Sequence, residues 1–173
     1  MPSQTRPTFS LTTTFAPQKR STLAAFMAVS SDPAADYGKI RVLQLPSNTT
    51  IPGPAQVQNN FESNPSISSQ LSLLRKGGSE VDMGNLLSLP VAGGVLYVEP
   101  VFIRATTDGY PLLRKVLVGY GANVALENTL DVALAKVFVP LTFPGIVSGV
   151  GLVFTSTLGS AVQTISSQIL LAT

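Results

Sequence analysis

The sequence predicts an α+β fold, in which an antiparallel sheet is combined with two or three short helices and followed by a C-terminal hydrophobic segment. Three observations carry this prediction. Residues 8–15 alternate apolar and polar side chains with the period of two that is typical of a half-buried strand. Residues 64–76 instead space their apolar side chains by three and four, as a helix does. No charged residue follows Lys136, so the chain ends in an uncharged stretch.

Three strands come first in the predicted order. The alternation in the first strand places Phe9, Leu11 and Phe15 on one face. The second strand spans residues 23–29 and is more apolar, and the third spans residues 39–45. Pro17 and the pair at residues 19–20 mark the first turn, and residues 31–38, which are rich in Ser, Asp, Pro and Gly, form the second loop. We expect these three strands to form an antiparallel meander.

Two helices follow the meander. Val57 and Phe61 lie four residues apart, which predicts one face of a short helix. Asn64 then begins a second helix, because an Asn side chain caps free backbone N–H groups and Pro65 suits the first helical position. The apolar stripe of this second helix consists of Ile67, Leu71 and Leu74. We expect it to stop at Gly77, since glycine commonly follows the last helical turn.

A long hairpin is the next predicted element. Residues 81–91 and 95–105 are rich in Val, Leu and Ile, and Gly93 and Gly94 between them suit a two-residue turn. This turn fixes the pairing, and one face of the ribbon is then almost wholly apolar, which supports the register. The predicted pairs are Val91 with Leu96, Leu89 with Val98, Leu87 with Pro100, and Met83 with Arg104.

One more strand and a last helix complete the predicted module. The strand spans residues 112–120. Asn128 is the expected N-cap of the helix, with Asp131 in its first turn. The buried stripe of this helix consists of Leu130, Leu134 and Val137. Residues 1–138 are therefore predicted to form one soluble α+β module, and residues 139–173 an uncharged hydrophobic tail.

The tail has two interpretations. Residues 137–154 carry no charge over about the shortest length that crosses a bilayer, and a helix would begin near Pro144. Gly145 and Gly149 have the spacing of small residues that lets helices pack closely in lipid. The other interpretation is a pair of buried strands, which Val147, Val150, Val153 and Phe154 support.

Composition excludes several classes of function. The chain has no Cys and no His, which removes disulfides, thiolate metal sites and the commonest general base. The formal net charge is only +2 and the basic residues are scattered, so we expect no nucleic-acid partner. Residues 1–7 lack the apolar region of a signal peptide, so export would require a segment further upstream.

Two polar pairs on the hairpin are the candidate sites. Ser88 faces Glu99 in the predicted register, and a hydroxyl beside a carboxylate is either a weak general-base pair or a cross-strand hydrogen bond. We favour the hydrogen bond. Asp82 and Arg104 lie near each other on the same ribbon, where an exposed ion pair is the better interpretation. We therefore predict no catalytic, cofactor-binding or metal-binding residue, and a chain that is not an enzyme.

The hairpin also carries a resemblance to a known family. Residues 84–91 (Gly-Asn-Leu-Leu-Ser-Leu-Pro-Val) and 96–101 (Leu-Tyr-Val-Glu-Pro-Val) resemble the signature of actinobacterial integral membrane proteins known as uncharacterised protein family one-eight-two. Supporting stretches are residues 9–15, 23–29, 52–61 and 110–116. The resemblance spans about residues 7–138. It implies that several membrane spans precede this module, that the module is extracytoplasmic, and that its role is structural or in interaction.

The same resemblance suggests the partners: the membrane, or the membrane spans of the module's own full-length protein. It implies no catalytic residue and no cofactor. The tail departs from the family pattern, because residues 137–149 are similar to the start of a span in permeases of polyamine-type ABC transporters. That similarity implies the opposite side of the membrane, and as an alternative function a transport-associated subunit or permease fragment. A junction between two unrelated reading frames is a further interpretation of the tail.

Overall fold

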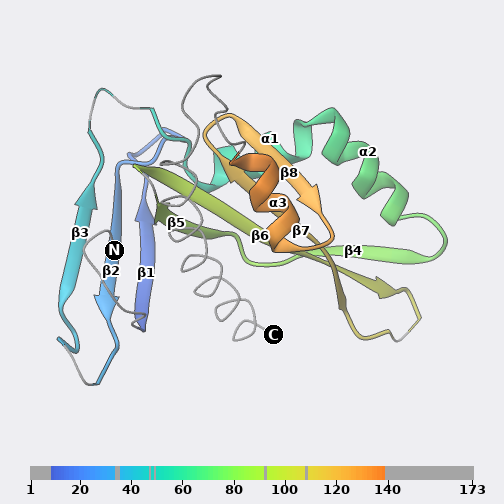
Figure 1. The fold of residues 1–173 in the computed structure, drawn as a ribbon, viewed down its shortest axis with the longest axis horizontal. Coiled ribbons are helices and arrows are strands. Elements are labelled where there is room, and N and C mark those ends of the chain that lie inside the picture. The colour runs from blue at the N-terminus through green and yellow to red at the C-terminus, as the bar shows by residue number, and fades with distance from the viewer. Residues whose placement is uncertain are drawn as a thin grey trace, which may run out of the picture.

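The computed structural model describes residues 9–33, 36–46, 48, 50–91, 93–107 and 109–138. These residues form an α+β fold of two antiparallel sheets and three helices, which confirms the predicted class (Figure 1). The predicted tail, residues 139–173, lies outside the described residues. Within the described part of the chain, no helix has both the length and the apolar character needed to cross a membrane.

The first sheet is the predicted meander. Its strands are β1 (Ser10–Phe15), β2 (Ala25–Ser30) and β3 (Ile40–Gln44), in the spatial order β1-β2-β3. Both pairings are antiparallel, and Val29 of β2 lies opposite Leu11 on one side and Ile40 on the other. Directly opposed residues share a face, so this register sorts the side chains of all three strands into two faces.

Two helices then run end to end, α1 (Pro54–Ser63) and α2 (Pro65–Leu74). The predicted cap is confirmed, because the Asn64 Oδ1 accepts hydrogen bonds from the backbone N–H groups of Ser66 (3.0 Å) and Ile67 (3.2 Å). The end of α2 differs from the prediction: its last residue is Leu74, and Gly77 lies beyond it. The Lys76 N–H donates to the Leu73 carbonyl at 3.2 Å, three residues back rather than four, so the regular α-helix ends before the glycine.

The second sheet has five strands around a long central one. They are β4 (Ser79–Met83), β5 (Leu87–Val91), β6 (Gly94–Ala105), β7 (Leu112–Tyr120) and β8 (Asn123–Glu127), followed by α3 (Leu130–Val137). The order is β4-β6-β7-β8, and β5 pairs with the same edge of β6 further along. All of these pairings are antiparallel.

The predicted register of the long hairpin is wrong. Val91 pairs with Gly94 rather than with Leu96. Gly93 has a φ of +77° and lies in the turn, whereas Gly94 is already in the strand, covered by the ring of Tyr120. Because the shift is even, Leu87 and Leu89 remain on the same face as Val98 and Leu96, so the predicted apolar face of this part of the hairpin survives the error.

The predicted strand at residues 81–91 is in fact two strands. Met83 pairs with Val101, not with Arg104, and Leu87 pairs with Val98, so Glu99 and Pro100 lie opposite the connection between β4 and β5. Proline has no backbone N–H to donate to an edge strand, which accounts for the break in pairing at this point. The connection is nevertheless held to β6, since the Gly84 N–H donates to the Pro100 carbonyl at 2.8 Å.

The end of the module differs from the prediction in two ways. β8 was not predicted, and the N-cap of α3 is Thr129 rather than Asn128, with no side-chain hydrogen bond at the cap. The predicted stripe of α3 is confirmed, because Leu134 and Val137 are buried and Leu130 packs against the same cluster. The Asn123 side chain at the start of β8 donates to the carbonyl of Val137 at 3.0 Å, which ties the end of α3 to the sheet.

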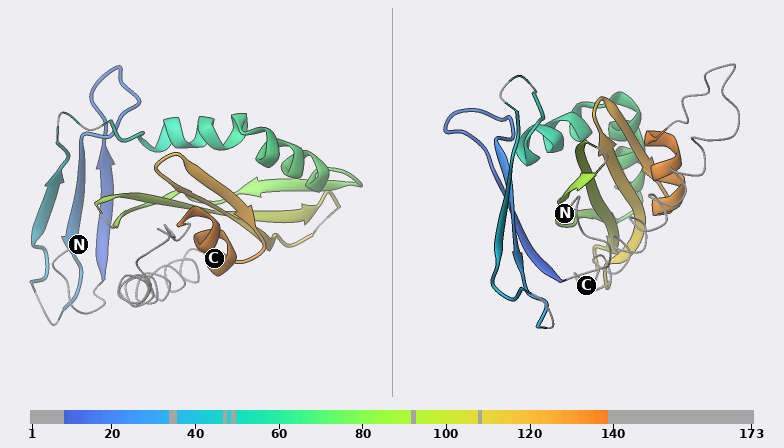
Figure 2. Two further views of the ribbon diagram at one scale, coloured as in Figure 1. Left: turned by 45° about the horizontal axis from the view of Figure 1, so that its top comes forward. Right: turned by 60° about the vertical axis from the view of Figure 1, so that its left-hand side comes forward.

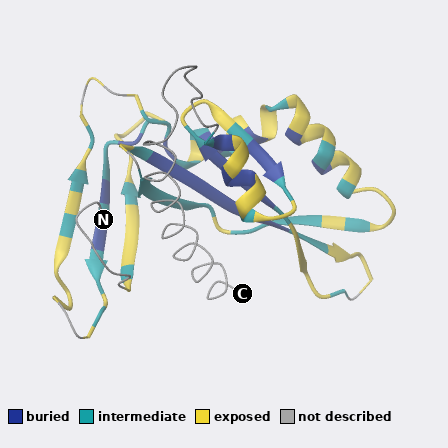
Figure 3. Cartoon of the chain, viewed as in Figure 1, coloured by how far each residue is buried: buried dark blue, intermediate teal, exposed yellow. Residues whose placement is uncertain are grey.

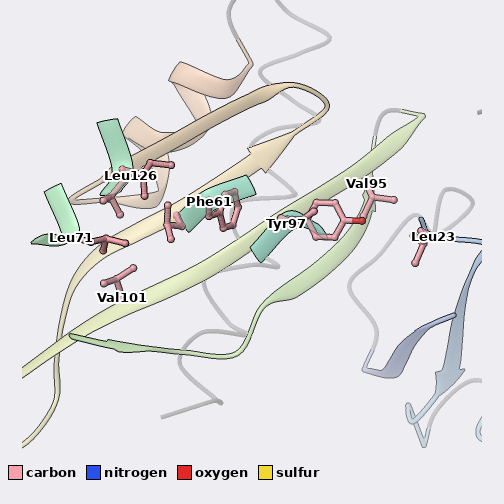
Figure 4. Packing of buried hydrophobic residues seen from close by; sticks show 10 residues of the cluster. Leu23, Phe61, Leu71, Val95, Tyr97, Val101 and Leu126 are labelled. Carbon is pink, nitrogen blue, oxygen red and sulfur yellow. The ribbon is translucent and has the colours of Figure 1, made fainter. Parts of the chain in front are cut away.

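Helices cover both faces of the five-stranded sheet (Figure 2). On one face, side chains of α1 and α2 pack against alternate residues of β6, as the close view of this cluster shows (Figure 4). The buried members are Leu23, Val57, Phe61, Ile67, Leu71, Val95, Tyr97, Val101, Leu117 and Leu126. On the other face, α3 packs against a second cluster, formed by Leu96, Val98, Val116, Val118, Ala125, Ala133, Leu134 and Val137.

The two sheets meet at the start of α1. The backbone N–H of Gly53 donates to the Ser21 carbonyl at 2.7 Å, and that of Leu23 donates to the Ile51 carbonyl at 2.7 Å. The Tyr97 hydroxyl on β6 donates to the carbonyl of Pro52 at 2.5 Å. The segment that enters α1 is therefore bonded both to the loop between β1 and β2 and to the central strand of the second sheet.

Candidate functional site

One face of the three-stranded sheet gathers large apolar side chains that are exposed among the described residues. We call it the apolar face and define it by its large apolar side chains, which are those of Phe9, Leu11, Phe15, Met27, Val29, Ile40 and Val42. The polar residues Thr13 and Gln44 lie on the same side of the sheet. The outer members retain between 48% (Phe15) and 75% (Leu11) of their accessible surface. Figure 3 shows how much of β1 and β3 is exposed. Large apolar side chains gathered on one exposed face typically mark an interaction site.

The opposite face of the same sheet is different. Its central residues, Phe26 and Ala28 of β2, are 3% and 5% exposed. The alternation of the first strand predicted that the side with Phe9, Leu11 and Phe15 would be the buried one. The structure confirms that these residues share a face but leaves that face exposed among the described residues.

The second candidate is a buried carboxylate on β6. Glu99 is 3% exposed and is the one charged residue buried among those the structure describes. It lies on the face covered by α1, directly opposite Leu117 of β7. Burial, with a smaller contribution from the charge of Glu62, raises the pKa of Glu99 to about 7, although a hydrogen bond from Gln58 opposes the shift.

Gln58 of α1 lies between the two carboxylates. One end of its side-chain amide is 3.0 and 3.1 Å from the two carboxylate oxygens of Glu99. The other end is 3.4 Å from Glu62 Oε1 on the surface of α1. Tyr97, two residues before Glu99 on the same face, has a pKa raised to about 12 by burial, so its hydroxyl keeps its proton and the bond to Pro52.

The sequence analysis identified Glu99 as a candidate residue but assigned it the wrong hydrogen-bond partner. Ser88 lies opposite Tyr97, not opposite Glu99, so the predicted hydroxyl–carboxylate pair is not formed in that register. Gln58 was not predicted as a partner, because 41 positions along the chain separate it from Glu99 and no local pattern joins a helix residue to a strand residue.

The second predicted pair is confirmed as an exposed ion pair. The Arg104 guanidinium bonds Asp82 Oδ2 at 2.8 Å and also Glu80 Oε2 at 2.6 Å. Glu80 is the residue directly opposite Arg104 in the register. All three side chains are about half exposed, so the network contributes little to stability. Among the described residues, no three acidic side chains are arranged to hold a metal ion.

Comparison with known proteins places the chain in a family. The Uncharacterised protein family (UPF0182) matches residues 1–74. A UPF0182 protein of Streptomyces coelicolor is 58% identical over 139 residues, which cover 80% of this chain. The chain belongs to the UPF0182 family.

Two other members of the family are similar over 80% and 79% of this chain. UPF0182 proteins of Leifsonia xyli and Thermobifida fusca are 52% and 48% identical over 151 and 140 residues. The matched region is only 14–15% of the length of these relatives, so the chain corresponds to a small part of each. No solved structure matches the chain.

Proposed function

We propose that this UPF0182 module is a non-catalytic, extracytoplasmic interaction domain of an integral membrane protein, and that its apolar face docks on another segment of the same polypeptide. The observation that carries the proposal is the exposed apolar face of β1, β2 and β3. Covering apolar surface releases about 25 cal/mol per Å², so an exposed face of this kind favours contact with an apolar partner.

The size of the face favours an intramolecular partner over a second copy. Three strands about 4.8 Å apart, each about six residues long at about 3.3 Å per residue, give a face of roughly 300 Å². A stable interface between separate proteins takes about 800 Å² from each partner. A segment of the same chain needs far less area, because the link between them keeps its effective concentration in about the millimolar range.

The lengths of the relatives supply such a segment. This chain matches only 14–15% of them, so most of a UPF0182 polypeptide is outside this module and is available to cover the face. The extracytoplasmic position rests on the resemblance to actinobacterial integral membrane proteins. The non-catalytic role is supported by the polar groups, because Arg104 is held by Glu80 and Asp82, and Lys136 bonds Glu127.

Cysteine labelling tests the docking. The chain has no Cys, so single cysteines at Leu11 and Val42 report on the apolar face without background from the module. Tyr110 is 90% exposed outside the apolar face and is the control position. In the 173-residue chain, all three cysteines should react with a maleimide. In the full-length protein, with other cysteines removed, Leu11→Cys and Val42→Cys should be protected at least tenfold, while Tyr110→Cys stays reactive.

The same variants test the location. A maleimide that does not cross membranes should label Tyr110→Cys of the full-length protein in intact cells. Labelling only after lysis would overturn the extracytoplasmic position and favour the transport-associated alternative, which has the opposite topology. Equal reactivity of Leu11→Cys in the chain and in the full-length protein would overturn the docking. A disulfide that joins two copies of the Leu11→Cys variant would show that the face docks on a second copy, and it would overturn the intramolecular partner.

A further inference from the structure

The amide of Gln58 lies between two acidic side chains, and it cannot bond two ionised carboxylates at once. One end of a glutamine amide is a donor and the other is only an acceptor, whereas an ionised carboxylate only accepts. If the nitrogen faces Glu62, the oxygen faces Glu99 at 3.0–3.1 Å, and Glu99 must then carry a proton to donate. If the nitrogen faces Glu99, that carboxyl is satisfied as an anion and the oxygen faces Glu62.

Burial decides which carboxyl holds the proton. Glu99 is 3% exposed, whereas Glu62 is on the exposed side of α1 and can be solvated as an anion. Of the two, Glu99 is therefore the one that stays neutral more easily. The raised pKa of Glu99, about 7, agrees with this choice and has burial as its first cause.

The groups packed around Glu99 give its charge little support. From α1 come Gln58 and the anionic Glu62, from β6 comes Tyr97, whose hydroxyl bonds Pro52, and from β7 comes the apolar Leu117. No ion pair joins Glu99 to a basic residue within the described part of the chain. Among the side chains that the structure describes, the amide of Gln58 is the group placed to bond an anion at this position.

We propose that Glu99 and Gln58 form a proton-operated switch in which the amide reverses its orientation. When Glu99 is protonated, its O–H donates to the oxygen of Gln58, and the nitrogen of Gln58 donates to Glu62. When Glu99 loses the proton to solvent, the amide turns so that its nitrogen bonds Glu99, and the bond to Glu62 is lost. The switch does not depend on the proposed docking.

The position of the switch gives it a structural consequence. Gln58 is one turn into α1, and the segment that enters α1 is bonded to both sheets through Gly53 and Pro52. Ionisation of Glu99 places a buried negative charge between α1 and the second sheet, bonded by the neutral amide of Gln58 and by no basic residue of the described part of the chain, and this weakens the contact of the helix with the strands. We therefore expect α1 to pack less tightly on the second sheet as the pH rises. The contact between the two sheets at the start of α1 should weaken with it.

Nuclear magnetic resonance of the 173-residue chain tests the switch. The carboxyl carbon of Glu99 and the side-chain amide of Gln58 should titrate together, with a common midpoint near pH 7. In Glu62→Gln the midpoint should be lower, because the charge of Glu62 raises the pKa of Glu99. In Glu99→Gln the Gln58 amide should no longer respond to pH in this range.

Three results would overturn the switch. A Glu99 carboxyl that titrates near 4.5 would mean that it is an ordinary anion. A Gln58 amide that still responds near pH 7 in Glu99→Gln would mean that it reports on another group. A Gln58 amide that does not change while Glu99 titrates would mean that the amide does not turn. The first and third are measured on the natural sequence, so they hold even if a variant fails to fold.

Discussion

The two sheets of this module are made of similar strands, but their faces are covered differently. In the five-stranded sheet, every residue of β6 from 95 to 101 is buried, because α1 and α2 lie on one face and α3 lies on the other. In the three-stranded sheet, Phe26 is buried on one face, while Leu11 and Ile40 are largely exposed on the other. The exposed face of the three-stranded sheet therefore carries large apolar side chains of the kind that usually lie on a covered face.

The sequence of a strand indicates which side chains share a face, but it does not indicate whether that face is covered. Alternation determines which side chains share a face, because successive residues point to opposite sides. Whether that face is covered depends on the rest of the protein. β1 has the alternation of a half-buried strand, which predicts that its apolar face, with Leu11 and Phe15, is the buried one. In this chain that face is exposed. The comparison therefore predicts that substitutions in the two sheets have very different effects.

The largest effect is expected for Leu117→Ala in the second sheet. Leu117 is fully buried at the centre of the cluster covered by α1 and α2. Removing its side-chain carbons leaves a cavity, and such changes cost about 2–5 kcal/mol. Urea denaturation of the 173-residue chain measures the loss. A cost below about 1 kcal/mol would mean that this sheet is not the packed core.

The next largest effect is the pH dependence contributed by Glu99. Its pKa is raised from 4.5 to about 7 in the folded protein, so the folded state keeps the proton over a range in which the unfolded state has lost it. The free energy of unfolding is therefore expected to fall as the pH rises from 4.5 to 7, and to level off above. With about 1.4 kcal/mol per pH unit, the total is about 3 kcal/mol.

Glu99→Gln tests this pH dependence directly. The variant should remove the decline and should unfold at higher urea concentration than the natural sequence at pH 8, because a neutral amide replaces a buried charge. Glu80→Gln is the matched control, since Glu80 is exposed and paired with Arg104. The control should retain the decline. A natural chain whose stability does not change between pH 5 and 8 would contradict the prediction.

A smaller loss is expected for Gly119→Ala. A β-carbon at Gly119 would lie 2.9 and 3.1 Å from two ring carbons of Phe61, a side chain that is 1% exposed and has little room to move. Overpacking of this kind costs about 1–3 kcal/mol. Ala25→Val is the control, because Ala25 belongs to the same side as the apolar face. Thermal melting should separate the two variants, with Ala25→Val near the natural value.

Local chemistry made part of the fold predictable. Asn64 followed by Pro65 identified the start of α2, because both residues act through the backbone of their own helix. The spacing of Val57 and Phe61 identified the buried side of α1. The ion pair of Arg104 was predictable because long charged side chains on neighbouring strands reach each other even when the register is misjudged.

The remainder depended on contacts that the sequence does not mark. β8 was missed because Val124, Ala125 and Leu126 are consecutive apolar residues packed on both faces, so no alternation identifies the strand. The hairpin register was wrong because Gly93 and Gly94 both suit a turn by residue type, whereas in the structure Gly94 pairs with Val91 inside the strand and lies against the ring of Tyr120. The Glu99 site required knowing that α1 lies over β6.

The smallest effect, and the sharpest test of the comparison, is expected for Leu11→Ala on the apolar face. Leu11 is 75% exposed, so the change should alter the free energy of unfolding of the 173-residue chain by about 0.5 kcal/mol or less. In the full-length protein the same change should lower the stability of the docked module by about 2 kcal/mol or more, because a docked Leu11 would be buried. Protease resistance of the module, compared between Leu11→Ala and the exposed control Tyr110→Ala, measures that difference. If both variants are as resistant as the natural protein, the apolar face is not covered, and the two sheets differ for a reason other than a missing partner.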